Sequence, residues 1–71
     1  MTFGERLRSF RQDRGYSVED ISTILGVPVN LVEKWETAGR KPTVINALKL
    51  ATLYHVTVDE LVGDTLSIKT K

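Results

Sequence analysis

The stretch GVPVNLVEKWE, residues 26–36, carries side chains that can recognise another molecule. Its apolar residues follow the three-and-four spacing of a helix, yet Val29 and Glu33 fall at positions that should face solvent. Asn30 offers an amide that both donates and accepts hydrogen bonds, and Lys34 adds a cation. The helix is therefore either a buried structural element or one that contacts a ligand, and its neighbours decide between the two.

A pair of cations follows this stretch. Arg40 and Lys41 are adjacent within AGRKP, residues 38–42, whose glycine and proline are typical of a loop. Two cations beside backbone N–H groups can bind an anion, although most surface cations are only solvated. The net charge of +1, from 10 Lys and Arg against 9 Asp and Glu, gives no general reason to expect a polyanionic partner.

No catalytic or metal site is predicted. The chain has no cysteine and His55 is its single histidine, so neither a zinc site nor a disulfide framework can be assembled. Ser17, Thr43 and Thr57 each fit the N-cap position of a helix, which leaves no nucleophile with an acid and a base beside it. We expect no enzyme activity, no cofactor and no metal.

Length and composition indicate one small domain. With 71 residues, of which 41% are apolar and 27% charged, the chain suffices for a single modest core. It contains no apolar run of the roughly 18 residues that a membrane span needs, and no signal-peptide pattern. We therefore expect a cytoplasmic protein without membrane contact.

Five short helices follow from the spacing of apolar residues and from helix caps. The first is expected at residues 3–14, the second between Ser17 and Gly26, the third at about residues 28–37, the fourth after Thr43 and the fifth between Thr57 and Gly63. The expected inward-facing residues are Phe3, Leu7, Phe10, Ile21, Ile24, Leu25, Leu31, Val32, Trp35, Val44, Ala47, Leu48, Ala51, Tyr54, Leu61 and Val62.

The second and third helices have the dimensions of a helix-turn-helix, because only Gly26 and Val27 separate them. Glycine suits the left-handed backbone conformation of such a turn, since it has no side chain to clash. Trp35 then faces inward and is expected to pack in the core rather than to stack on a nucleic-acid base. The outward face of the third helix is left with Val29, Asn30, Glu33, Lys34 and Thr37.

Four segments extend this pattern along the chain. They are GERLRSFRQDRGYS, EDISTILGV, WETAGRKP and LKLATLYHVTVDELVG, all within residues 3–64. In their order and spacing they resemble the DNA-binding domain of the lambda Cro and repressor family, also called the XRE family. The resemblance implies an all-α, compact five-helix bundle that places its third helix in the major groove of DNA, usually as a two-fold homodimer on a palindromic operator.

The resemblance also implies roles for individual positions. Base contacts, or contacts to nearby phosphates, fall to Val29, Asn30, Glu33 and Lys34. Phosphate contacts fall to Val18, Thr37, Gly39, Arg40 and Lys41. Arg11 and Glu36 match a structural ion pair that links the first helix to the third. The DNA-binding domain then covers residues 1–64, and residues 65–71 form a tail that is either flexible or associated with a dimer.

The chain departs from the family pattern in three places. Val18 stands where a glutamine often binds a phosphate, and it can offer only its backbone N–H. Pro28 replaces a serine cap, and the usual glycine after the tryptophan and glutamate appears one residue late, at Gly39. These changes leave the expected fold intact, but they weaken the expected affinity for DNA.

The side chains of the third helix suit particular base edges. Asn30 can pair with adenine, Val29 can pack on a thymine methyl group, and Glu33 can accept a hydrogen bond from cytosine. For Glu33 two alternatives stay open: an ion pair with Lys34 or Arg40, or a negative charge that rejects wrong sites.

The sequence therefore predicts a sequence-specific, double-stranded-DNA-binding transcriptional regulator, with a repressor as the expected type. Two alternatives remain. One is a protein-interaction module that binds its partner through the third helix around Val29. The other is a nonspecific nucleic-acid binder, which the near-neutral charge disfavours. The self-association surface is expected on the last helix, near Val58, Leu61 and Val62, with Leu66 and Ile68 extending it.

Overall fold

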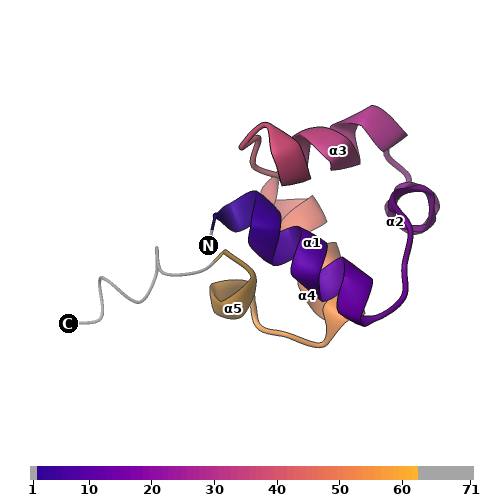
Figure 1. The fold of residues 1–71 in the computed structure, drawn as a ribbon. Coiled ribbons are helices and arrows are strands. Elements are labelled where there is room, and N and C mark those ends of the chain that lie inside the picture. Colours follow the sequence, from indigo (N-terminus) through magenta and orange to yellow (C-terminus); the bar gives the residue numbers. More distant parts are fainter. Residues whose placement is uncertain (1, 63–71) are drawn as a thin grey trace.

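Five helices make up the part of the chain that the structure describes, residues 2–62 (Figure 1). In this computed structural model they are α1 (Phe3–Asp13), α2 (Val18–Leu25), α3 (Val29–Thr37), α4 (Val44–Tyr54) and α5 (Val58–Val62). No strand occurs among the described residues. The predicted all-α, five-helix fold is confirmed. The expected tail, residues 65–71, lies outside the described residues.

Side-chain caps start the helices at the residues that the sequence indicated. The Ser17 hydroxyl accepts the N–H of Asp20 at 3.0 Å, and the Asp20 carboxylate accepts the N–H of Ser17 at 2.9 Å. Thr43 caps α4 at 3.3 Å from the N–H of Asn46, and Thr57 caps α5 at 3.0 Å from the N–H of Glu60. Each cap satisfies a backbone donor that has no partner within its helix, so these residues define where the helices begin.

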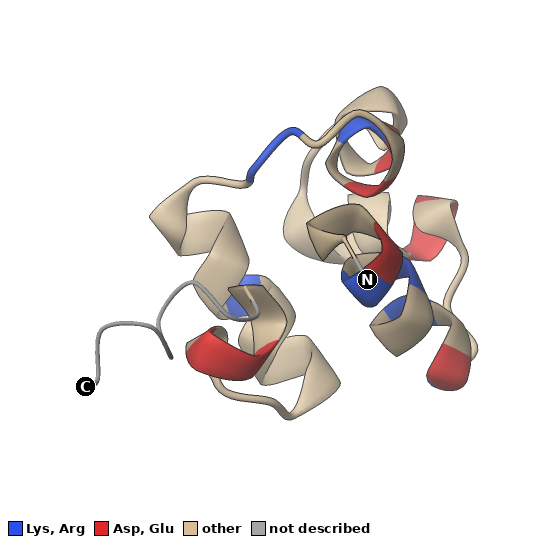
Figure 2. Ribbon diagram, turned by 60° about the vertical axis from the view of Figure 1, so that its left-hand side comes forward, with Lys and Arg blue, Asp and Glu red and all other residues tan. Residues whose placement is uncertain are grey.

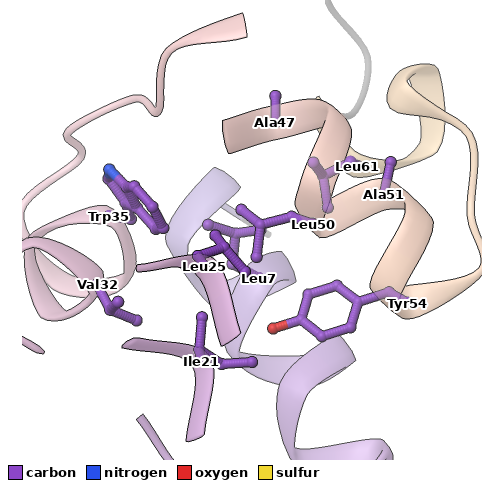
Figure 3. Close-up of a cluster of buried hydrophobic side chains, with 10 residues drawn as sticks. All are labelled: Leu7, Ile21, Leu25, Val32, Trp35, Ala47, Leu50, Ala51, Tyr54 and Leu61. Atoms are coloured by element: carbon purple, nitrogen blue, oxygen red, sulfur yellow. The ribbon is translucent and has the colours of Figure 1, made fainter. Parts of the chain in front are cut away.

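The core takes side chains from all five helices (Figure 3). Its members are Leu7, Ile21, Leu25, Val32, Trp35, Ala47, Leu50, Ala51, Tyr54 and Leu61. Trp35 is only 1% exposed. The prediction that it packs in the core is confirmed, because a side chain so buried cannot stack on a base.

Three residues that were predicted to face the core are exposed instead. The exposed fraction is 50% for Ile24, 51% for Leu48 and 76% for Val44. The buried side of α4 is formed by Ala47, Leu50, Ala51 and Tyr54. Leu48 lies about 100° around the helix from Ala47, which turns it away from this side, and Val44 lies in the first turn, ahead of the buried residues. The predicted apolar stripe had merged two faces of the same helix.

The prediction of a self-association surface on α5 near Val58, Leu61 and Val62 is wrong for Leu61. Leu61 is 0% exposed, because α5 packs against α4 and α1 and uses this side chain to close the core. Val58 and Val62 are half-buried. Leu66 and Ile68, which were expected to extend the surface, lie outside the described residues.

Candidate nucleic-acid interface

A tight turn between α2 and α3 sets the direction of the third helix. Gly26 has φ 74° and ψ 36°, the left-handed conformation that glycine adopts without a steric penalty. The carbonyl of Ser22 accepts the N–H groups of Gly26 and Val27, at 2.9 Å and 3.1 Å. The Ser22 hydroxyl in turn donates to the carbonyl of Val27. Ser22 therefore stabilises the turn through its backbone carbonyl and its side chain, a role that could not be predicted from the sequence.

A buried ion pair joins α1 to the end of α3. The Arg11 Nε and Nη2 atoms donate to the two carboxylate oxygens of Glu36, at 2.7 Å and 3.0 Å. The exposed fractions are 9% for Arg11 and 8% for Glu36. A third guanidinium nitrogen, Nη1, donates to the carbonyl of Tyr16 at 3.0 Å. The hydrogen bonds to Glu36 raise the pKa of Arg11 above its ordinary value, so the bidentate contact favours the charged guanidinium.

Gly4 allows α1 and α3 to approach closely. A methyl group at this position would overlap the backbone carbonyl of Glu36. The α1 backbone therefore rests directly on the last turn of α3, beside the Arg11 ion pair. The role of Gly4 could not be predicted from the sequence, because a glycine near the start of a helix reveals nothing about its distant neighbour.

The candidate base-contacting residues lie on the side of α3 that faces away from the core. Val32 and Trp35 are buried, whereas Asn30, Glu33 and Lys34 are exposed and Val29 is half-buried. Among the described residues, no ion pair joins Glu33 to Lys34 or Arg40. One rigid helix thus presents an amide, a carboxylate and an ammonium group to solvent.

Three of the candidate phosphate-contacting residues share one hollow. Thr37, Gly39 and Lys41 line a space of about 310 Å³ between the start of α1 and the loop after α3. Thr2, Phe3, Gly4 and Glu36 complete its lining. The Lys41 ammonium lies 5.5 Å from the centre of the Phe3 ring, which is a cation–π distance. Phe3 therefore helps to position this lysine, a contact that the sequence analysis missed.

Two donors near this hollow are already used inside the protein. The backbone N–H of Arg40 donates to the carbonyl of Lys34 at 3.2 Å, and the Thr37 hydroxyl donates to the carbonyl of Glu33 at 2.7 Å. The exposed cations of the loop are the side chains of Arg40 and Lys41. The Arg40 N–H and the Thr37 hydroxyl proton are therefore already engaged, and the positive charge of the loop is carried by the side chains of Arg40 and Lys41.

Val18 lies apart from these residues, at the first position of α2. It is half-buried, and Glu19 and Asp20 follow it in the first turn. The helix dipole favours an anion at this end, but these two carboxylates already occupy the favourable position and repel a further negative charge. The structure therefore keeps Val18 separate from the hollow and gives it an acidic surrounding.

The charged residues are distributed unevenly over the fold. Figure 2 shows a basic segment in the loop between α3 and α4, whereas α5 is acidic and lies at the other end of this view. Among residues 2–62, no group of three or more histidine, cysteine or acidic side chains could hold a metal ion. No helix in the same region is both long and apolar enough to cross a bilayer.

Comparison with known sequences identifies relatives over most of the chain. A family model described as helix-turn-helix matches residues 7–61. The HTH-type transcriptional regulator ImmR of Bacillus subtilis is 35% identical over 63 residues, which cover 89% of this chain and 50% of ImmR. The uncharacterized HTH-type transcriptional regulator YazB of the same organism is 30% identical over 59 residues, covering 83% of this chain and 86% of YazB. The chain thus spans half the length of ImmR.

Solved structures share both the fold and part of the sequence. The restriction-modification controller protein C.AhdI from Aeromonas hydrophila has a TM-score of 0.73 and 36% identity, covering 83% of this chain and 89% of that one. A transcriptional regulator from Listeria innocua has a TM-score of 0.78 and 28% identity, with 96% and 69% covered. Helix-turn-helix regulators of this kind are not enzymes, in agreement with the prediction from the sequence. The chain belongs to the helix-turn-helix family of Cro- and repressor-like, or XRE, domains.

Proposed function

We propose that this chain is a cytoplasmic, sequence-specific DNA-binding repressor of transcription that reads the major groove with α3. The arrangement of α3 supports this proposal most directly. Trp35 and the Arg11–Glu36 pair fix its inner side, while Asn30, Glu33 and Lys34 are exposed on its outer side. A helix held so firmly can present side chains to base edges at defined positions.

Each outer residue of α3 has a contact that suits its chemistry. The Asn30 amide can bond both N6 and N7 of adenine, and Val29 can pack on the methyl group of thymine. Glu33 can accept a hydrogen bond from the amino group of cytosine, and Lys34 can reach a base or a nearby phosphate. These contacts would supply the sequence preference.

Phosphate contacts would set the position of the domain on the duplex. The side chains of Arg40 and Lys41 carry the charge, Thr37 and Gly39 line the hollow beside Lys41, and Val18 offers only a backbone N–H in an acidic surrounding. With so few phosphate contacts, a single domain is expected to bind DNA weakly. We infer that two copies share the task on a palindromic operator, with their α3 helices about 34 Å apart.

The alternative, in which α3 binds a protein through Val29, has weaker support. Val29 is half-buried, and the exposed neighbours Asn30, Glu33 and Lys34 are polar or charged. A protein-binding helix would instead be expected to show an apolar exposed face.

An electrophoretic mobility shift against genomic fragments, with competitor DNA present, separates the alternatives. Specific binding predicts that a few discrete fragments stay bound as the competitor increases. Release of all fragments together would indicate a nonspecific binder, and the absence of any shift at low salt would favour the protein-interaction module. Either of these two results would contradict the proposal.

A further inference from the structure

The two cations of the loop after α3 have different surroundings. The Lys41 ammonium lies 5.5 Å from the centre of the Phe3 ring, whereas no ring in the described part of the chain lies at such a distance from Arg40. Among residues 2–62, no carboxylate lies within ion-pair distance of Lys41. Within this region, the ammonium of Lys41 is thus in contact with an aromatic ring and keeps its full positive charge.

A ring and a carboxylate restrain a lysine with different consequences. A ring attracts the cation through its quadrupole and leaves the net charge unchanged. A carboxylate would instead neutralise the cation and compete with a phosphate for it. A lysine held by a ring is therefore restrained and can still attract an anion.

The Phe3 ring has a fixed place beside the end of α3. The Thr2 hydroxyl accepts the N–H of Glu5 at 3.1 Å, and the Glu5 carboxylate accepts the N–H of Thr2 at 2.9 Å. On the other side of Phe3, the Gly4 backbone rests on the carbonyl of Glu36. Figure 1 shows the first turn of α1 beside the end of α3. The contacts of its two neighbours therefore determine where the ring lies.

The backbone that carries Lys41 is fastened to the same end of α3. The carbonyl of Lys34 accepts the N–H groups of Ala38 and Arg40, at 3.0 Å and 3.2 Å. Gly39 lies between these two donors with φ 71°, a left-handed conformation that costs glycine nothing in steric energy. The loop thus has a defined path away from α3, and the ring restrains the far end of the lysine side chain.

We propose that Phe3 is a positioning residue for DNA binding, which acts through Lys41. This inference rests on the proposed function, in which Lys41 contacts a phosphate. Thr37, on the exposed side of α3, lines the same hollow as Lys41, so this lysine adjoins the proposed reading surface. A lysine side chain loses rotamer freedom when it binds, which weakens binding. The ring restricts the side chain before the DNA arrives and so removes part of this loss.

A double-mutant cycle tests the proposal by fluorescence anisotropy, with a labelled duplex of about 20 base pairs and mixed sequence at low salt. Phe3→Leu should weaken binding about two- to five-fold, because the gain cannot exceed the strength of an exposed cation–π contact. In a Lys41→Gln background, Phe3→Leu should have no further effect. In an Arg40→Gln background it should keep its full effect. Phe3→Tyr retains a ring and should bind as wild type.

Phe10→Leu is the matched control, because it makes the same change on the same helix. Both phenylalanines are half-buried and pack against the core, but the Phe10 ring lies 5.2 Å from the Arg14 guanidinium instead of a loop cation. Phe10→Leu should leave the affinity for the duplex unchanged, and melting curves verify that each variant is folded. Equal losses for the two leucine variants, or a loss from Phe3→Leu that persists in the Lys41→Gln background, would overturn the proposal.

Nuclear magnetic resonance measures the same contact without DNA. The ring current should shift the ε-methylene proton signals of Lys41 upfield in wild type and in Phe3→Tyr, but not in Phe3→Leu. Unshifted signals in wild type would contradict the contact. A wild type that retains discrete genomic fragments, while Phe3→Leu binds the duplex equally well, would refute this inference alone. A wild type that binds no duplex at low salt would refute the proposed function as well.

Discussion

The Arg11–Glu36 pair is the residue contact that most directly holds α3 in position. Glu36→Ala leaves the Arg11 guanidinium buried without its partner and should lower the free energy of unfolding by roughly 3 kcal/mol. Arg8 provides the control: it lies 3.6 Å from the same carboxylate, but its side chain is 47% exposed, so Arg8→Ala should cost less than about 1 kcal/mol. Urea denaturation measures the free energy of unfolding of both variants and of wild type. Equal losses for the two variants would contradict the assignment of Glu36 as the buried partner.

Asn30 and Lys41 should affect DNA binding in different ways. Asn30→Ala should lose about 1–3 kcal/mol at one base position of each half-site and relax the preference there. Lys41→Ala should weaken binding to all sequences similarly and flatten the dependence of affinity on salt. Titrations against a set of single-base operator variants compare the two. An Asn30→Ala protein that retains the full preference of wild type would show that Asn30 does not read a base.

The buried hydroxyl of Tyr54 predicts a loss of stability in alkali. Burial raises the pKa of Tyr54 from 10.0 to about 12. Between these pH values the unfolded chain loses the phenol proton while the folded protein keeps it, so the free energy of unfolding falls as pH rises. Tyr54→Phe should reduce this fall by roughly 1–2 kcal/mol. Denaturation of wild type and of Tyr54→Phe at pH 10 and at pH 12 measures this difference. An equal loss of unfolding free energy in the two proteins would contradict the raised pKa of Tyr54.

At the scale of elements, the contact between α1 and α3 depends on a missing side chain. Gly4→Ala introduces a methyl group that overlaps the backbone carbonyl of Glu36, so α1 must move. We expect a loss of about 1–3 kcal/mol in the free energy of unfolding. Gln12→Ala, an exposed change on the same helix, should stay within about 0.5 kcal/mol of wild type. Thermal unfolding measures the stability of the two variants. A Gly4→Ala protein as stable as Gln12→Ala would rule out the close approach of Gly4 to the Glu36 carbonyl.

The helices could be predicted from the sequence because their signals are local. Ser17, Thr43 and Thr57 cap within three residues, and Gly26 marks the turn by its own backbone. The side of α4 that packs inward could not be predicted in this way. Its apolar residues cover more than one face, and only the neighbouring helices decide that Leu50 is buried and Leu48 is not.

Contacts between residues that lie far apart in the sequence could not be predicted either. The Arg14 guanidinium donates to the carbonyl of Tyr54, at 3.1 Å and 2.7 Å, and so satisfies the end of α4 from a position 40 residues away. The Lys41 ammonium lies over the ring of Phe3, a residue 38 positions earlier in the chain. No spacing rule links such residues. For the candidate interface, the sequence could therefore name the outward positions of α3 but not the hollow that Lys41 helps to line.

At the scale of the whole molecule, α3 and α4 expose surfaces of different chemistry. The outer side of α3 and the following loop carry polar and basic groups, whereas α4 exposes the apolar side chains of Val44, Ile45 and Leu48. Under the proposed function, the polar and basic surface would contact the DNA.

Selection of bound sequences from a random DNA pool measures whether α3 reads a specific DNA sequence. If two copies of α3 read base edges on a palindrome, repeated selection should enrich one two-fold symmetric sequence whose half-sites are centred about 10 base pairs apart. The same selection with Asn30→Ala should lose the preference at one position of each half-site and keep the spacing. A pool that stays unenriched while the protein binds it would contradict the claim, because binding would then depend on the phosphate backbone alone.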